Sequence, residues 1–161
     1  MKHFLFTAAL LCAAVPAFAQ ERPPLPQKLF ASAAEVEQAI AKARADHKGD
    51  NTNTVEVLAN VGTYPVQLEY RTGATAPSVH LAQAELIYVV EGGCTMIMGG
   101  TLVGGRTNGN NMTGTSVTGG TPHQFAKGDY ILVPAGMPHW VSEVHGGPFI
   151  TTTLHMPMTA Q

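Results

Sequence analysis

Histidine and carboxylate residues interrupt two strand-like segments of this sequence at positions that share one face. In the first segment, His80 lies five residues before Glu85. If a short bend at residues 82–84 joins neighbouring strands, both side chains point into the same space. In the second segment, His139 follows a proline–glycine turn and opens a new strand, in which Glu143 has the same parity. Imidazole and carboxylate groups on an inward face can bind a cation or transfer a proton.

Five further residues are candidates for the same interior. Glu143 could act there as a general base or an additional ligand, although a surface carboxylate at a strand end fits the pattern as well. His155 follows a strand-like run near the C-terminus, and His123 precedes another one, where it could reach the pocket mouth. Tyr70 and Trp140 could wall a cavity, although aromatic residues in barrels more commonly belong to the core.

One helix is expected before the strands that must position these residues. Ser32 lies three residues before Glu35, which is the reciprocal capping pattern of a helix N-terminus. Val36, Ile40 and Ala43 then recur at helical spacing. The narrow apolar stripe favours a helix that braces a barrel.

From residue 54 onward the apolar period changes from 3.6 to 2. The expected strands centre on residues 55–57, 66–70, 87–89, 96–98, 131–133, 141 and 150, and the expected turns on residues 62, 73, 92–93, 128–129, 134–136 and 146–148. Many short strands separated by such turns predict an antiparallel sandwich or barrel. Residues 99–121 are rich in Gly, Thr and Asn and predict a long inter-strand loop, either a lid or a passive surface insertion.

The N-terminus has the pattern of an export signal. Lys2 precedes a short apolar run that Pro16 breaks, and small residues up to Ala19 form a cleavage site. We expect a signal peptide over residues 1–19, an extended leader over 20–31 and one domain over 32–161. Cleavage after Ala19 predicts a periplasmic or secreted protein, and an uncleaved anchor is the alternative.

Composition excludes several classes of function. The formal net charge is −2, 12% of the residues are charged, and no run of basic residues provides a nucleic-acid surface. No second apolar stretch predicts a membrane span after signal cleavage. Because Cys12 leaves with the signal, Cys94 has no partner and is expected to be a buried apolar residue. Patterns for a nucleophilic serine, a nucleotide-binding loop and paired zinc-binding cysteines are absent.

Two motifs in order resemble those of the cupin superfamily. The first reads Ser78-x-His80-x4-Glu85-x6-Gly92, and the second reads Gly128-x5-Pro134-x-Gly136-x2-His139-x3-Glu143. The resemblance spans roughly residues 64–145. It implies an all-β double-stranded β-helix (jelly-roll) barrel with one N-terminal helix, and a metal held by three histidines and one glutamate.

The sequence departs from the cupin pattern at three positions. Ser78 replaces the first histidine ligand, Glu143 replaces an asparagine, and Gly73 is displaced by one residue. The resemblance therefore implies His80, Glu85 and His139 as the remaining ligands. Two imidazoles and one carboxylate can hold Zn, Fe, Mn, Ni or Cu. Ser78 could be a weak oxygen ligand, a hydrogen-bond donor to one of the ligands, or a bystander, and the sequence leaves these three roles open.

These features favour a metal-dependent enzyme that acts on a small molecule in the periplasm or outside the cell. Dioxygenase, isomerase and lyase chemistry are all compatible with the metal site. The alternative is a non-catalytic cupin that binds a small molecule or a metal. A homodimer is also expected from the resemblance, because open sheet edges need cover.

Overall fold

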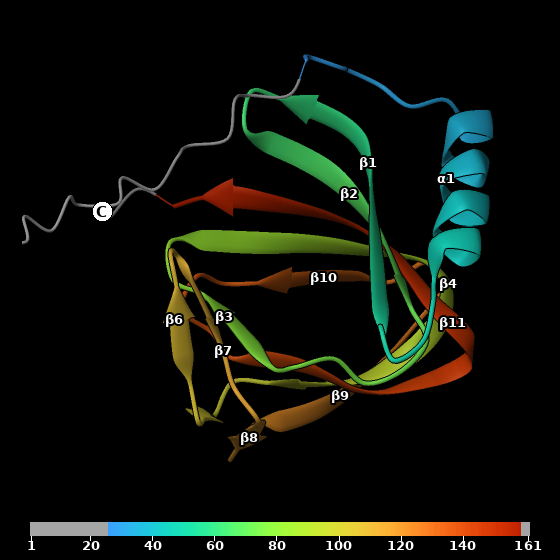
Figure 1. Ribbon diagram of the computed structural model, residues 1–161. Coiled ribbons are helices and arrows are strands. Elements are labelled where there is room, and N and C mark those ends of the chain that lie inside the picture. Colours follow the sequence, from blue (N-terminus) through green and yellow to red (C-terminus); the bar gives the residue numbers. More distant parts are fainter. Residues whose placement is uncertain (1–25, 159–161) are drawn as a thin grey trace, which may run out of the picture.

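The computed structural model describes residues 26–158, which form one helix followed by an antiparallel β-barrel (Figure 1). The helix is α1 (Ala33–Asp46). The strands are β1 (Asn53–Val61), β2 (Tyr64–Arg71), β3 (Ser78–His80), β4 (Gln83–Met98), β5 (Thr101–Val103), β6 (Arg106–Asn108), β7 (Asn111–Thr113), β8 (Ser116–Thr118), β9 (Thr121–Ala126), β10 (Tyr130–Val133) and β11 (His139–Pro157). The predicted signal peptide and the first half of the predicted leader (residues 20–25) lie outside the described residues. Within them, no helix is both long enough and apolar enough to cross a bilayer.

The expected helix is confirmed, together with its cap. The Ser32 side chain accepts a hydrogen bond from the backbone N–H of Glu35, whose carboxylate accepts one from the Ser32 N–H. Ile40 and Ala43 are buried against β1 and β2, in a cluster that includes Leu68. Figure 1 shows the helix lying along the outer side of these strands. The helix therefore covers one face of β2 and leaves the other face to the barrel interior.

Two long bent strands form the frame of the barrel. β4 has 16 residues and β11 has 19. They pair antiparallel, with Gln83 opposite Pro157 at one end and Met98 opposite His139 at the other. The expected turns at residues 92–93 and 146–148 are therefore wrong, because the chain bends there without leaving the strand. Gly92 has a φ of 71°, and the pairing slips between His145 and Ile150. Bulges and glycines of this kind let one strand pass from one sheet layer into another.

The apolar core lies between the two long strands and β10. Val89, Met96 and Phe149 are completely or almost completely buried in this cluster. Cys94 belongs to it and is a free, buried cysteine, as expected. Burial raises the pKa of its thiol to about 11, so the group stays protonated at neutral pH.

Residues 99–121 are not the structureless loop that composition suggested. β5 pairs with β8, while β6 and β7 form a hairpin that also pairs with β3. Backbone hydrogen bonds hold these short strands together and need few apolar side chains, so the low apolar content concealed them. The β6–β7 hairpin lies beside β3 in Figure 1 and brings Asn111 opposite His80.

Candidate metal centre

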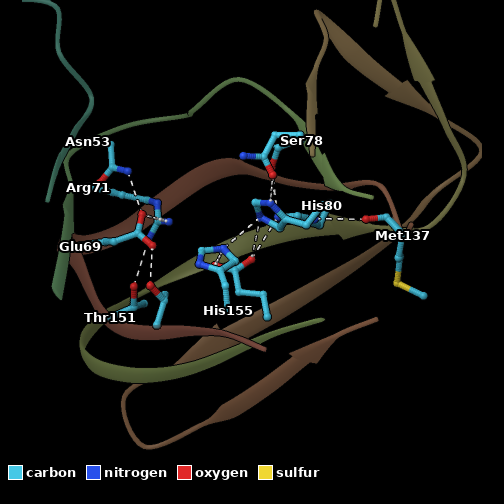
Figure 2. Close-up of polar contacts among 12 residues, drawn as sticks. Asn53, Glu69, Arg71, Ser78, His80, Met137, Thr151 and His155 are labelled. Atoms are coloured by element: carbon cyan, nitrogen blue, oxygen red, sulfur yellow. Dashed lines mark hydrogen bonds and ion pairs between the residues drawn. The ribbon is translucent and has the colours of Figure 1, made fainter. Parts of the chain in front are cut away.

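The strand register gathers four residues that are far apart in sequence. His80 ends β3 and Glu85 lies near the start of β4, while His139 and His155 lie at opposite ends of β11. His155 is the direct pairing partner of Glu85 across β4 and β11, and His139 pairs with Ser78 of β3. Figure 2 shows that Ser78, His80 and His155 meet at one place. The three predicted residues His80, Glu85 and His139 are therefore brought together, and His155 joins them.

The carboxylate of Glu85 lies at the centre of this cluster. Its Oε2 is 3.2 Å from His139 Nε2 and 3.4 Å from His80 Nε2, and its Oε1 is 3.7 Å from His155 Nε2. The Nε2 atoms of His80 and His155 are 3.2 Å apart. Glu85 is 3% exposed, and its Oε2 is buried without a hydrogen-bond partner. A buried carboxylate oxygen in this state is costly unless a proton or a cation satisfies it.

In two of the imidazoles, Nδ1 faces an oxygen atom that can only accept a hydrogen bond. His80 Nδ1 is 2.7 Å from Asn111 Oδ1, and His139 Nδ1 is 3.2 Å from the carbonyl oxygen of Met137. Each Nδ1 must therefore carry the proton, which leaves the lone pair of a neutral ring on Nε2. Metal-binding histidines are oriented in this way by hydrogen bonds on the opposite side of the ring.

The titrating groups of the cluster shift in opposite directions. Burial alone raises the pKa of Glu85, but the nearby imidazoles of His139 and His80, in their charged form, outweigh burial and lower this pKa. Burial alone lowers the pKa of His80, but hydrogen bonds with Glu85 and Asn111 outweigh it and raise this pKa. Burial lowers the pKa of His155, and the charge of Glu85 offsets only part of that decrease. Glu85 is thus kept as an anion, which favours a cation at the centre of the cluster.

The donor set and its spacing fit a single metal ion. Bonds of about 2.1 Å place neighbouring ligand atoms about 3.0–3.4 Å apart in octahedral and tetrahedral sites. Most of the separations around Glu85 lie in that range. Ligand atoms of His80, Glu85 and His155 all lie within 4.8 Å of one another. The orphaned oxygen of Glu85 is also the kind of atom that a cation would satisfy.

Ser78 contacts a histidine and not the carboxylate. Its Oγ is 3.0 Å from His139 Nε2 (Figure 2), so the hydroxyl donates to the lone pair of that ring. Trp140 lies farther from the cluster, and its Nε1 donates at 2.7 Å to the carbonyl oxygen of Thr75, a residue that lines the cavity beside the cluster. Both residues therefore support the site from its periphery.

Three other candidates point elsewhere. Tyr70 packs against the helix, because α1 covers the face of β2 to which it belongs. His123 is exposed on β9 and stacks on Phe125. The side chain of Glu143 is 68% exposed, since a bulge between Val141 and Glu143 ends the parity shared with His139. The structure does not bring these three residues to the cluster.

The opposite face of β2 supplies a polar wall that the sequence analysis missed. Glu69 and Arg71 form an ion pair that is buried beside the cluster (Figure 2). Thr153 donates to Glu69 at 2.9 Å, and Arg71 donates to Thr151 at 3.0 Å. The signal was the alternation of β2 itself, whose charged residues lie on the face opposite Leu68. Only a helix over the other face explains why both faces are buried.

A cavity of about 220 Å³ connects the polar wall with the cluster. Its lining residues are Asn53, Val55, Gln67, Glu69, Arg71, Thr75, Ala76, Ser78, His80, Glu85, His139 and His155. The cavity therefore gives a small molecule access to the four residues around Glu85.

Comparisons with known proteins agree with this architecture. Residues 49–145 match the cupin family. The solved structure of TT1209 from Thermus thermophilus is 17% identical, with a TM-score of 0.51, over 72% of this chain and 93% of that chain. A Klebsiella pneumoniae protein with a double-stranded β-helix domain is also 17% identical, with a TM-score of 0.50, over 71% and 85% of the two chains. A search of curated proteins found no match. The expected double-stranded β-helix fold is confirmed.

Proposed function

Because the chain belongs to the cupin family, we propose that it is an exported enzyme that uses one divalent metal ion to act on a small molecule. The convergence of three imidazoles on the buried, unpartnered carboxylate oxygen of Glu85 carries this proposal. Such a donor set suits Zn, Fe, Mn, Ni or Cu. The cavity of about 220 Å³ beside it supports a small substrate.

The proposed ligands are His80, Glu85, His155 and His139. Ligand atoms of the first three all lie within 4.8 Å of one another, and His139 Nε2 lies 3.2 Å from the Glu85 Oε2 that His80 also approaches. His155 thus restores the three-histidine, one-glutamate composition that Ser78 removes from the first motif. Ser78 contacts the lone pair of His139 Nε2 that would bind the metal, so its hydroxyl would have to turn away from that nitrogen when the ion binds.

The protein's own residues would bind and protect the reacting centre. A bound divalent metal supplies Lewis-acid catalysis or oxygen chemistry, and dioxygenase, isomerase and lyase reactions all remain within this proposal. Glu85 is 3% exposed, so water is largely excluded around its carboxylate and electrostatic interactions there are strengthened.

Metal stoichiometry of purified variants tests the site. We expect wild type to bind one ion per chain after reconstitution with Mn²⁺, Fe²⁺, Ni²⁺ or Zn²⁺, as measured by elemental analysis. His80→Ala/His155→Ala should lose at least nine-tenths of that metal, because it removes two ligands. His123→Ala is the matched control, since His123 is an exposed histidine outside the cluster. Full stoichiometry in the double variant would show that the metal binds elsewhere.

A non-catalytic binder is the rival outcome. Protein isolated from its native compartment should contain metal and should turn over a substrate found by screening small hydroxy and keto acids. Activity should disappear with a chelator and return with one ion per chain. A retained organic ligand that is released unchanged from metal-free protein would instead identify a binding protein.

Export is proposed from the sequence pattern of residues 1–19. Expression of the full chain in a bacterial host should place the protein in the periplasmic fraction or the medium. Its intact mass should correspond to a chain that begins at Gln20. A full-length mass in the membrane fraction would support the uncleaved anchor.

A further inference from the structure

The β6–β7 hairpin is attached directly to the strand that carries His80. Its inner strand pairs with β3 so that Asn111 lies opposite His80. The backbone N–H of Leu81 donates to the Asn110 carbonyl oxygen at 2.7 Å, and that of Gly136 donates to the His80 carbonyl oxygen at 2.8 Å. The backbone around His80 is therefore fixed from two sides, and one of them is the hairpin.

The side chain of Asn111 adds a second constraint, on the imidazole ring itself. Its Oδ1 lies 2.7 Å from His80 Nδ1, a short hydrogen bond that fixes both the ring orientation and the position of its proton. His80 Nε2 then faces Glu85 at 3.4 Å and His155 at 3.2 Å. A ring with its proton on Nε2 would instead direct an N–H group toward the centre of the cluster.

We propose that Asn111 is a positioning residue, which holds His80 in the Nδ1-protonated form and thereby makes the β6–β7 hairpin part of the metal centre. The effect of Asn111 on metal affinity rests on the proposed function, whereas its effect on the His80 ring does not. Met137 has the same effect on His139, but through a backbone carbonyl oxygen that no substitution removes. Asn111 is therefore the contact that mutagenesis can test.

Two deletion variants and one rescue variant separate this role from general stability. Asn111→Leu and Asn111→Ala remove the acceptor, while Asn111→Asp keeps an oxygen at the same place. Asn108→Leu is the matched control, because Asn108 pairs with Asn111 in the hairpin and is also exposed. The first readout is the ¹⁵N NMR spectrum of the His80 ring in metal-free protein. The second is metal affinity, measured by competition with a chelator.

We expect both deletion variants to move the His80 proton from Nδ1 to a mixture of the two ring nitrogens. Their metal affinity should fall by about 10- to 100-fold, the usual effect of losing a hydrogen-bond partner of a metal-binding histidine. Asn111→Asp and Asn108→Leu should keep the wild-type proton position, and neither should lose affinity. A wild-type ring spectrum or a wild-type affinity in the two deletion variants would overturn the proposal. If wild type binds no metal, the proposed function fails while the ring spectrum still decides the role of Asn111.

Discussion

Glu85 determines the electrostatics of the cluster because it is its one buried anion. Burial opposes its ionisation, but three imidazoles within 3.7 Å favour it in their charged form, and the net effect is a lowered pKa. The carboxylate is therefore more acidic in the folded protein than in the unfolded chain. This difference links the stability of the metal-free protein to pH.

The stability of the metal-free protein should therefore depend on pH through Glu85. Because its pKa is lowered in the folded state, Glu85 stabilises the metal-free protein above its unfolded pKa of about 4.3. That contribution is lost as the pH falls from there toward the folded-state pKa. Between about pH 5 and pH 3, we expect the melting temperature of Glu85→Gln to fall by less than that of wild type. Calorimetry in the presence of a chelator measures this.

Glu143→Gln is the control for the loss of one carboxyl group, because Glu143 lies outside the cluster. The pH dependence of its melting temperature should follow that of wild type. Parallel curves for wild type and Glu85→Gln would show that the histidines do not stabilise the Glu85 anion.

At this scale the sequence identified part of the cluster. Motif spacing singled out His80, Glu85 and His139, and the strand register then brings the Nε2 atoms of both histidines within 3.4 Å of Glu85 Oε2. His155 was only a candidate for the cavity wall, because its position opposite Glu85 depends on the pairing of β4 with β11. Asn111 had no signal at all, since its contact depends on a hairpin that composition concealed.

At the scale of elements, the bends in β4 and β11 decide which residues share the cavity. Each strand crosses from one layer of the barrel to the other, and the two bends lie side by side. At Gly92 a side chain would collide with the carbonyl oxygen of Pro148 on β11. Glycines in an apolar sequence also mark turns, and the sequence contains no information on which partner strand approaches. The bends were therefore mistaken for turns, although the strands on either side were expected correctly.

The second prediction separates backbone strain from this close approach. Gly92 and Gly146 both have a φ of 71°, but a Cβ atom added at Gly146 meets nothing within 4 Å. Gly146→Ala should lower the free energy of unfolding by about 1–2 kcal/mol, from the left-handed backbone alone. Gly92→Ala adds the collision with Pro148 and should lower it by about 3 kcal/mol or more. Urea denaturation of the metal-free proteins gives both values.

Equal losses in the two variants would show that the strands separate easily at the bend. A larger loss for Gly92→Ala would support a rigid crossing that fixes the positions of Glu85 and His155 relative to each other.

At the scale of the whole molecule, the cluster connects parts of the chain that only the closed barrel brings together. Its residues come from β3, β4 and both ends of β11. Strand periodicity was sufficient to predict an antiparallel sandwich or barrel, and the choice of a barrel was implied by the family resemblance. The order of strands in the sheet depends on long-range pairing and was implied only by the family resemblance. The predicted homodimer stays a prediction.

The third prediction follows from this connectivity. The unfolded chain separates His80 from His155, so it cannot reproduce the site, and a metal bound by the cluster must stabilise the folded state. At a free metal concentration of 100 times the Kd, the gain is about 2.7 kcal/mol, or roughly 5–10 °C in melting temperature. Scanning calorimetry with and without a chelator measures the shift. His80→Ala/His155→Ala should show no such rise, and His123→Ala should show the full one. An equal rise in all three proteins would mean that the cation binds outside the barrel, and the barrel would then position these imidazoles for another ligand.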